Sequence, residues 1–299
     1  MKILRAEHLG MCFGVRDAIA LAKAHAAQQP VTILGQLVHN ETVLNDLKQH
    51  GVRMAEQVND VTTPSVLITA HGTSQRHLAH IRDQGLEVFE ATCPLVHHAH
   101  NSVLKLVRAG YHPIIIGQRN HVEVRGLTGD LDACDVVLTE QDIEALSPHE
   151  RFGVVSQTTQ PIARVRELVA QLKERFPHSE VKFVDTVCQP TKQRQQAAEE
   201  LAQQSDVVIV IGGANSNNTK ELVNTCWRQC PYVHHVQSPA DLKAEWFTYA
   251  EVVGLTAGTS TPDSIIDAVE ARLKEIAAQF QPNTPIPREE KTHELATLL

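Results

Sequence analysis

The chain has 299 residues, a formal net charge of −8 and 42% hydrophobic residues, the composition of an ordinary globular protein. This length allows two or three compact units. The acidic balance and the absence of a long basic run argue against nucleic acid or an anionic membrane as a partner. Residues 1–10 lack the apolar segment of a signal peptide, and no run of 18 apolar residues occurs. We therefore expect a cytoplasmic protein that does not span a membrane.

Short apolar runs alternate with amphipathic segments, a pattern typical of βαβ units in a parallel sheet. In the first third of the chain, strands are predicted at 2–4, 31–35, 65–69 and 87–91, and helices at 15–27, 41–50 and 74–83. The middle third predicts helices at 95–108 and 161–176 and strands at 113–117, 152–155 and 181–187. The last third predicts helices at 192–204 and 263–278 and strands at 207–211 and 252–255.

Three cysteines, Cys12, Cys93 and Cys188, follow a strand pattern and precede a helix pattern. Their separations of 81 and 95 residues are too long for a solenoid and suit a small α/β domain. The third copy lacks its own last strand and cysteine, which residues 1–12 can supply. The sequence thus predicts three pseudo-threefold-related small parallel-sheet α/β domains closing into a ring.

The predicted domain boundaries follow from these cysteines. Residues 1–12 form the N-terminal strand that completes domain three. The remaining ranges are domain one at 13–93, domain two at 94–188, domain three at 189–280 and a C-terminal tail at 281–299.

Polar side chains cluster where the predicted strands end. Because ligands of parallel α/β sheets bind beyond the carboxyl ends of the strands, we expect these side chains to converge on one ligand. Histidines, hydroxyls and amides together suit a multiply charged anion, and Glu123 is the natural proton donor among them. No P-loop or dinucleotide fingerprint occurs. The residues are His39, His71, His121, Glu123, Thr158, Ser216, Asn217, Asn218 and Ser260.

The chain contains six cysteines, which in a presumed reduced compartment argue against a disulfide framework. Three thiolates that leave a fourth ligand position open suit either zinc or an iron-sulfur cluster, and thiolate softness does not separate the two. Cys134 is interpreted as a core residue. Cys226 and Cys230 have helical i, i+4 spacing and lie near His234 and His235, but they complete no zinc pattern.

Several motifs in fixed order resemble those of the 4-hydroxy-3-methylbut-2-enyl diphosphate reductases of the non-mevalonate isoprenoid pathway, the LytB family. The resemblance covers about residues 1–280. The matching segments are 11–15, 38–40, 70–72, 91–96, 121 with 123–124, 157–159, 185–188 with 194–195, 215–216 with 218, and 256–258 with 260.

This resemblance implies one four-iron four-sulfur (4Fe-4S) cluster per chain, held by Cys12, Cys93 and Cys188, with the fourth iron free for the substrate's hydroxyl. It implies reductive dehydroxylation of 4-hydroxy-3-methylbut-2-enyl diphosphate to isopentenyl and dimethylallyl diphosphates plus water, using two electrons and two protons. A ferredoxin or flavodoxin would supply the electrons.

The resemblance also implies individual roles. Glu123 would deliver a proton to the leaving hydroxyl, and Thr158 would hold that hydroxyl and the carboxylate in register. His121 would lie beside the diphosphate. The residues that would grip the diphosphate are His39, His71, Ser216, Asn217, Asn218 and Ser260. The chain departs from the family's usual residues at Val122, Asn217 and Gln189-Pro190.

Two alternatives remain open. A dehydrating enzyme similar to quinolinate synthase also uses three cysteines around an open iron, but it needs no external electrons. A non-catalytic iron-sulfur carrier would need neither Glu123 nor the anion-binding side chains, so the Glu123→Gln variant would leave a carrier unaffected.

Overall fold

The computed structural model describes residues 1–38 and 40–279. His39 and the predicted C-terminal tail at 281–299 therefore lie outside the described residues. The described chain forms three four-stranded sheets, all with parallel pairing. This arrangement confirms the predicted α/β fold class with three small parallel sheets.

Sheet B is built from the first third of the chain, in the strand order β3-β2-β4-β5. Its strands are β2 (Val31–Leu34), β3 (Arg53–Ala55), β4 (Ser65–Ile68) and β5 (Glu87–Glu90). The accompanying helices are α1 (Phe13–Ala26), α2 (Glu41–Gln49) and α3 (Gln75–Asp83), with a 3₁₀ turn at Val58–Asp60. Helix α3 packs its Leu78 and Ile81 against Val66 and Ile68 of β4.

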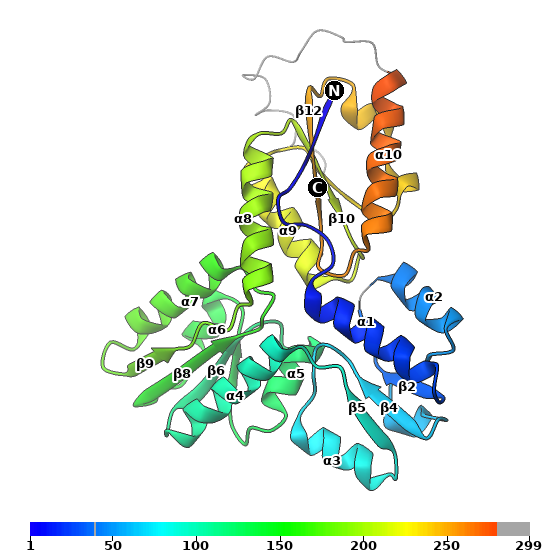
Figure 1. The fold of residues 1–299 in the computed structure, drawn as a ribbon. Helices are drawn as coiled ribbons and strands as arrows, with labels where there is room; N and C mark the ends of the chain where they lie inside the picture. Colours follow the sequence, from blue (N-terminus) through cyan, green and yellow to red (C-terminus); the bar gives the residue numbers. More distant parts are fainter. Residues whose placement is uncertain (39, 280–299) are drawn as a thin grey trace. The chain divides into compact units, whose positions relative to one another are not determined.

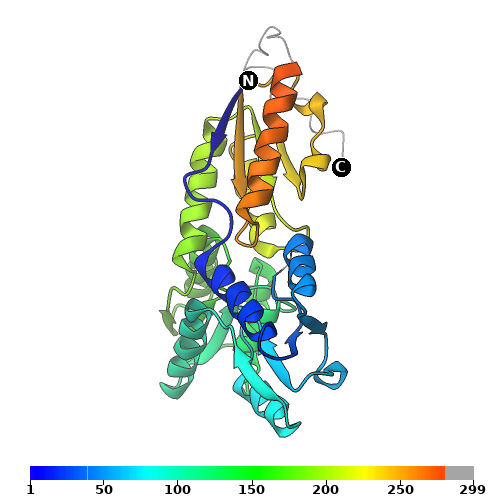
Figure 2. The ribbon, with the colours of Figure 1, turned by 45° about the vertical axis from the view of Figure 1, so that its right-hand side comes forward.

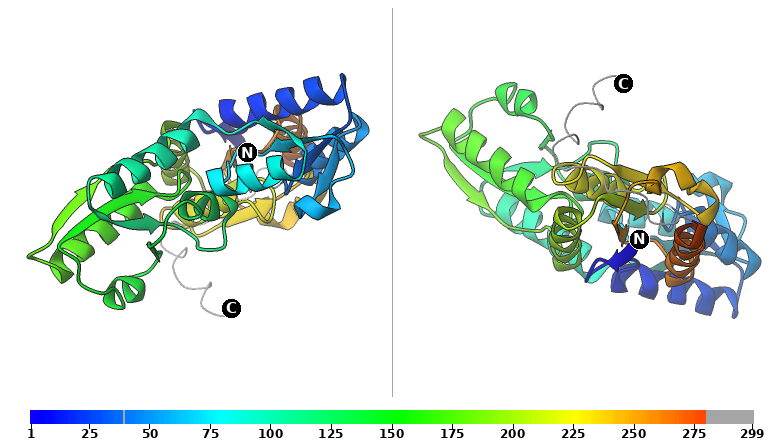
Figure 3. Two further views of the ribbon diagram at one scale, coloured as in Figure 1. Left: turned by 90° about the horizontal axis from the view of Figure 1, so that it is seen from below. Right: turned by 90° about the horizontal axis from the view of Figure 1, so that it is seen from above.

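Sheet C follows in the order β7-β6-β8-β9. Its strands are β6 (His112–Ile116), β7 (Asp135–Val137), β8 (Arg151–Ser156) and β9 (Glu180–Phe183). Its helices are α4 (Pro94–Arg108), α5 (Val122–Thr128), α6 (Glu140–Glu144) and α7 (Ile162–Arg175). Helices α4 and α7 cover opposite faces of the sheet (Figure 3).

Sheet A contains the last strands of the chain and the first one, in the order β1-β12-β10-β11. Its strands are β1 (Lys2–Arg5), β10 (Val207–Ile211), β11 (Val233–Val236) and β12 (Val252–Ala257). Its helices are α8 (Gln189–Gln203), α9 (Asn217–Trp227) and α10 (Asp263–Gln279), with 3₁₀ turns at Pro239–Asp241 and Ala244–Phe247. Strand β1 lies along β12, in register from Lys2 opposite Val252 (Figure 2).

The three sheets share one topology. In each, the first strand of the copy lies between the second and the third, and the fourth pairs with the third at the edge. In sheets B and C the fourth strand is β5 or β9, whereas in sheet A it is β1 from the other end of the chain. The parallel pairing of β1 with β12 therefore makes sheet A equivalent to the other two.

Alternation along the central strands explains how each sheet buries both faces. In β10, Val207, Ile209 and Ile211 pack against α10, while Val208 and Val210 face α8 and α9. Figure 1 shows α8 and α10 on either side of this sheet. Such a strand reads as a continuous apolar run because neither face meets water. At about 25 cal/mol per Å², burying each of these side chains contributes on the order of 2 kcal/mol.

Some expected elements differ from those observed. No helix was predicted after His121 or after Ser216, where the chain forms helices α5 and α9. Short strands β3, β7 and β11 and helix α6 were not predicted, because three to five residues carry too little periodicity. Strand β9 ends at Phe183, several residues before Cys188, and α8 begins at Gln189 rather than at 192.

The described chain divides into two compact units: residues 13–38 and 42–191 hold sheets B and C, and residues 1–12, 40–41 and 192–279 hold sheet A. The five predicted domain ranges remain a prediction. Within residues 1–38 and 40–279, no helix combines the length and the apolar character needed to cross a bilayer.

Candidate active site

The three predicted cluster cysteines occupy equivalent positions next to their own sheets. The backbone amide of each donates to a carbonyl two residues beyond the end of the sheet's third strand. Cys12 donates to Thr259 (3.1 Å), Cys93 to Ala70 (3.0 Å) and Cys188 to Thr158 (3.0 Å). This shared bond fixes each cysteine at the carboxyl edge of a sheet and immediately before a helix.

A few contacts describe the surroundings of the thiols. Cys93 is the N-cap residue of α4, but its side chain makes no capping hydrogen bond. A Cβ atom placed on Gly14 would lie 2.6 Å from Cys93 Sγ, so only glycine fits there. Cys188 Sγ lies 3.0 Å from the Thr191 hydroxyl. All three cysteines are partly exposed, and none of them forms a disulfide.

Glu123 and Thr158 form the most tightly bonded pair of predicted site residues. Glu123 lies in the first turn of α5 and is only 1% exposed. Its Oε1 accepts the Thr158 backbone amide (2.6 Å) and its Oε2 accepts the Thr158 hydroxyl (2.9 Å). Burial raises the pKa of Glu123 from 4.5 to about 7, although both hydrogen bonds from Thr158 act to lower it. The carboxyl group can therefore hold a proton near neutral pH.

Because Thr158 also accepts the Cys188 amide, it links the acid to one of the cysteines. The Thr158 carbonyl accepts the Cys188 amide, and the Thr158 amide donates to Glu123 Oε1. A displacement of Cys188 would therefore act on Glu123 through Thr158, and the reverse.

His121 precedes the acid and has a defined tautomer. It is the N-cap residue of α5, and its Nδ1 accepts the backbone amide of Glu123 at 3.2 Å. A nitrogen that accepts carries no hydrogen, so a neutral ring bears its proton on Nε2. The ring of His71 meets that of His121 edge to face, with centroids 5.4 Å apart. Gly72, at a φ of +71°, forms the turn that places His71 beyond β4.

In the other unit, predicted anion-binding side chains gather at the carboxyl edge of sheet A. Ser216 is the N-cap of α9 and accepts the Thr219 amide at 3.3 Å. Asn218 Oδ1 accepts the Thr259 amide at 2.9 Å. Asn217 is also buried, in the first turn of α9. The free amides of a helix N-terminus favour negative charge at this edge.

Several buried polar atoms at this edge have no hydrogen-bond partner among the described residues. Two belong to predicted residues, Asn218 Nδ2 and Ser260 Oγ. The hydroxyls of Thr219 and Thr256 share this state and were not predicted. Buried polar groups without partners cost stability, so such a group indicates a missing ligand or water. Thr256 lies in the motif segment 256–258, but its position inside β12 among apolar residues did not mark it as a binding residue.

The remaining cysteines belong to the core. Cys226 and Cys230 are buried against sheet A, where their thiols donate to the carbonyls of Ala198 (3.7 Å) and Asp206 (3.4 Å). Burial raises the pKa of Cys226 to about 12, which opposes the thiolate that a metal needs. Cys134 packs beside the α4 and α5 core of sheet C. The structure thus supports the interpretation of these cysteines as structural.

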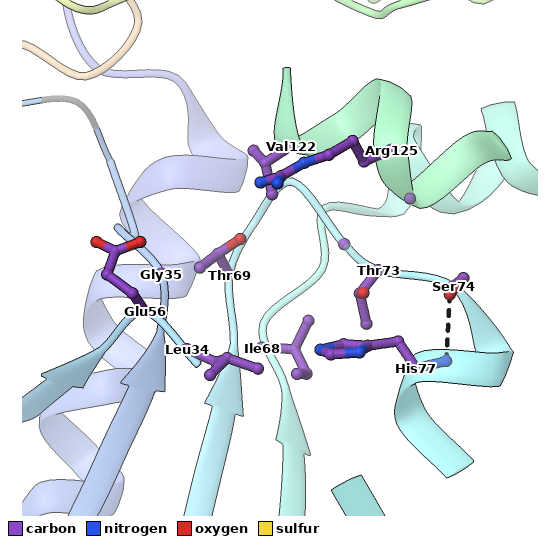
Figure 4. Close-up of a pocket in the computed structure, with 12 residues that line it drawn as sticks. Leu34, Gly35, Glu56, Ile68, Thr69, Thr73, Ser74, His77, Val122 and Arg125 are labelled. Carbon is purple, nitrogen blue, oxygen red and sulfur yellow. Dashed lines mark hydrogen bonds between the residues drawn. The ribbon is translucent and has the colours of Figure 1, made fainter. Parts of the chain in front are cut away.

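A separate pocket of about 340 Å³ lies at the carboxyl edge of sheet B (Figure 4). Its walls include Ile68, Thr69 and His77 and the α5 residues Val122 and Arg125. It is lined by the sequence neighbours of His71 and His121 but by none of the predicted site residues. We therefore assign the candidate site from the side-chain geometry rather than from this cavity.

The fold and site define a three-sheet α/β protein with three strand-end cysteines and a buried acid. The LytB protein family model matches residues 3–274. The 4-hydroxy-3-methylbut-2-enyl diphosphate reductase of Aquifex aeolicus is 39% identical over 92% of this chain and 96% of its own. The reductase of the same name from Trichlorobacter lovleyi is 36% identical over 92% of this chain and 99% of its own. The chain belongs to the LytB family.

Solved structures agree with this assignment. One of (E)-4-hydroxy-3-methyl-but-2-enyl diphosphate reductase, described as the terminal enzyme of the non-mevalonate pathway, matches with a TM-score of 0.67 and 38% identity over 92% of this chain and 100% of its own. The E-1-hydroxy-2-methyl-but-2-enyl-4-diphosphate reductase of Plasmodium falciparum matches with a TM-score of 0.85 and 26% identity over 96% of this chain and 94% of its own. These matches confirm the predicted family and enzyme class.

Proposed function

We propose that this chain catalyses the reductive dehydroxylation of 4-hydroxy-3-methylbut-2-enyl diphosphate. Two electrons and two protons enter, the allylic C–O bond breaks, and the products are isopentenyl or dimethylallyl diphosphate and water. The names of the similar reductases support this substrate.

We propose Cys12, Cys93 and Cys188 as the ligands of one 4Fe-4S cluster. Their equivalent amide bonds, their partial exposure and the absence of a disulfide at each of them fit three ligands to one group. The missing Cβ at Gly14 leaves room beside Cys93 Sγ. Cysteine thiolates are the usual ligands of such clusters. When bound, the cluster would supply the electrons and a Lewis acid.

The sheet A edge is proposed to bind the diphosphate. Asn218 Nδ2 and the Ser260 hydroxyl are buried donors without partners in the described chain, and they lie beside the N-terminus of α9. A diphosphate would satisfy these donors and meet the positive end of the helix dipole. Ser216 and Asn217 would add donors, together with His71 and His121. His39 remains a prediction from the sequence.

The single observation that carries the proposal is the protonatable acid. Glu123 has a pKa of about 7 because it is buried, and two bonds from Thr158 fix its orientation. The protonated carboxyl is proposed to donate to the substrate's hydroxyl so that it leaves as water. A carrier that only transfers electrons would not need an acid held in this way.

Diphosphate contacts remote from the breaking bond would hold the substrate while Glu123 acts, which uses binding energy to orient the reacting group. The Thr158 hydroxyl is proposed to keep the substrate's hydroxyl and the carboxyl group in register. The electron donor is proposed to be a ferredoxin or flavodoxin and the location cytoplasmic.

The test is anaerobic purification, assay of iron and sulfide, and measurement of reduced viologen oxidation on adding the substrate. We expect about four irons per chain, as the proposed cluster requires, and substrate-dependent oxidation of the dye. Glu123→Gln should retain iron and sulfide and lose turnover by roughly 10²- to 10⁴-fold, the usual contribution of general acid catalysis. Full turnover in Glu123→Gln would exclude the acid role. Turnover without added electrons would instead favour the dehydrating alternative.

A further inference from the structure

Three potential metal-binding side chains meet at the opposite, amino-terminal edge of sheet C. His112 is the first residue of β6, and Asp135 is the first residue of β7. His149 lies between α6 and β8, outside regular structure. Because β6 is paired with both β7 and β8, their amino ends bring these three side chains together.

The distances between these groups are short. His112 Nε2 lies 2.8 Å from Asp135 Oδ2, and the rings of His112 and His149 stack with centroids 3.8 Å apart and planes at 5°. One ligand atom from each of the three side chains lies within 4.8 Å of the other two. In tetrahedral zinc sites, the ligand atoms are about 3.3 Å apart, as follows from metal–nitrogen distances of about 2.05 Å. The three ligand atoms are therefore close to the separations that a bound ion requires.

Contacts with neighbouring residues position these side chains. The ring of Phe152, which is fully buried, contacts both histidine rings edge to face. The carbonyl of His149 accepts the Ser179 hydroxyl at 2.6 Å. Within the described part of the chain, no hydrogen bond or ion pair engages the ring nitrogens of His149 or the second oxygen of Asp135. Two ligands thus have unused donor atoms.

We propose that His112, Asp135 and His149 form a binding site for a borderline divalent cation such as Zn²⁺. Two imidazoles and one carboxylate are the ligand set that zinc accepts, with water in the fourth position. Parallel rings cannot both point a lone pair at one ion, so His149 rotates on binding while the His112–Asp135 pair opens by a few tenths of an ångström. This rotation takes place about the side-chain bonds of His149 and needs no shift of its backbone.

This site is separate from the proposed reaction site. Cys188 follows the carboxyl end of β9, whereas these ligands lie at the amino ends of neighbouring strands. The six-residue β8 corresponds to roughly 20 Å between the two edges, at about 3.3 Å per residue. The ion would tie β6, β7 and the segment before β8 together and stabilise sheet C without entering turnover.

The experiment is equilibrium dialysis of the cluster-loaded enzyme against Zn²⁺ alone, without oxygen, with iron, sulfide and zinc measured on the same sample. The variants are His149→Ala and Asp135→Asn, and the matched control is His80→Ala. His80 is exposed and belongs to another histidine pair, with His77 on α3 at 6.4 Å.

We expect one zinc per chain in the wild type and in His80→Ala, with iron and sulfide unchanged. His149→Ala should bind roughly 100-fold more weakly and Asp135→Asn at least about tenfold more weakly, because each loses a ligand or its charge. Zinc should raise the Tm of the wild type but not of His149→Ala. Unchanged iron and turnover in the variants would show that they are folded.

Equal zinc binding by the wild type and both variants would overturn the proposal, as would no binding by the wild type. Zinc uptake accompanied by loss of iron would also overturn it, because the ion would then occupy the cysteines. Failure of this test leaves the proposed reductase activity untouched, since the viologen assay measures that separately.

Discussion

Thr158 donates both its backbone amide and its hydroxyl to the carboxylate of Glu123, at 2.6 and 2.9 Å. These two bonds favour the charged carboxylate, while burial favours the neutral acid and is the larger effect. The resulting pKa of about 7 reflects this opposition. Changing either the hydrogen bonds or the burial should therefore shift the pKa of Glu123, and with it the pH above which the carboxyl group no longer carries a proton.

The Thr158→Val variant tests the hydroxyl alone, since the backbone bond remains. Loss of one bond to the charged form should raise the pKa of Glu123 above about 7. A required acid loses activity as pH rises through its pKa, so the falling limb of kcat/KM should move to higher pH. We also expect roughly tenfold lower turnover because the acid loses orientation. An unchanged pH profile would contradict the link between these residues.

Glu123 should also make stability depend on pH. Its pKa is raised from 4.5 to about 7, so between these pH values the folded chain holds a proton that the unfolded chain has released. Stability from this group is present at low pH and is lost as pH rises through about 7. The loss is up to about 3 kcal/mol. Urea unfolding of cluster-free protein at pH 5 and pH 8 should show this loss in the wild type.

Glu123→Gln is the matched variant, because it cannot ionise. The unfolding free energy of the wild type should therefore fall relative to that of Glu123→Gln as pH rises from 5 to 8. If the difference between the two stays constant from pH 5 to pH 8, Glu123 does not titrate in this range.

Gly14→Ala should damage the site although alanine is the better helix former. Helix propensity alone predicts a gain of about 1 kcal/mol. The new Cβ, however, would lie 2.6 Å from Cys93 Sγ and 3.1 Å from its Cβ, so the thiol must move. We expect iron and sulfide content after anaerobic loading to fall by about half or more, because ligand position controls cluster binding. Full iron content with a raised Tm would show that the contact has no role.

Neighbouring hydroxyls of Ser260 and Thr261 allow a paired test of the proposed diphosphate site. Ser260 Oγ is buried without a partner in the described chain, whereas the Thr261 hydroxyl donates to the Ile211 carbonyl at 3.1 Å. Ser260→Ala should raise the unfolding free energy of the ligand-free protein by roughly 1 kcal/mol and increase KM roughly tenfold.

Thr261→Val, the control, should lose up to about 1 kcal/mol, because the Ile211 carbonyl then keeps only the hydrogen bond from the Gly258 amide. It should change KM little. Denaturation and steady-state kinetics measure both quantities. A Ser260→Ala variant with lower stability and an unaltered KM would argue that this hydroxyl serves the fold rather than the ligand.

The sequence was sufficient for the parts of the fold that rest on local pattern. Short apolar runs such as Val207–Ile211 identify central strands, because a run of this length that is apolar on both faces is typical of a buried strand and too short for a helix. Recurrence of a cysteine between a strand and a helix identified the threefold repeat and predicted that residues 1–12 complete the third copy. The edge position of β1 beside β12 agrees with that expectation.

Tertiary structure alone decided the properties that depend on surroundings. The sequence named Glu123, but its raised pKa comes from burial in the folded chain. Gly14 was part of a motif, yet its role appears only where its missing side chain makes room for Cys93 Sγ. No motif in the sequence pointed to the cluster of His112, Asp135 and His149, because strand pairing brings together residues that are up to 37 positions apart. The local sequence pattern determines a helix or a strand. The burial of a side chain and the meeting of distant residues arise only when elements far apart in the sequence pack together.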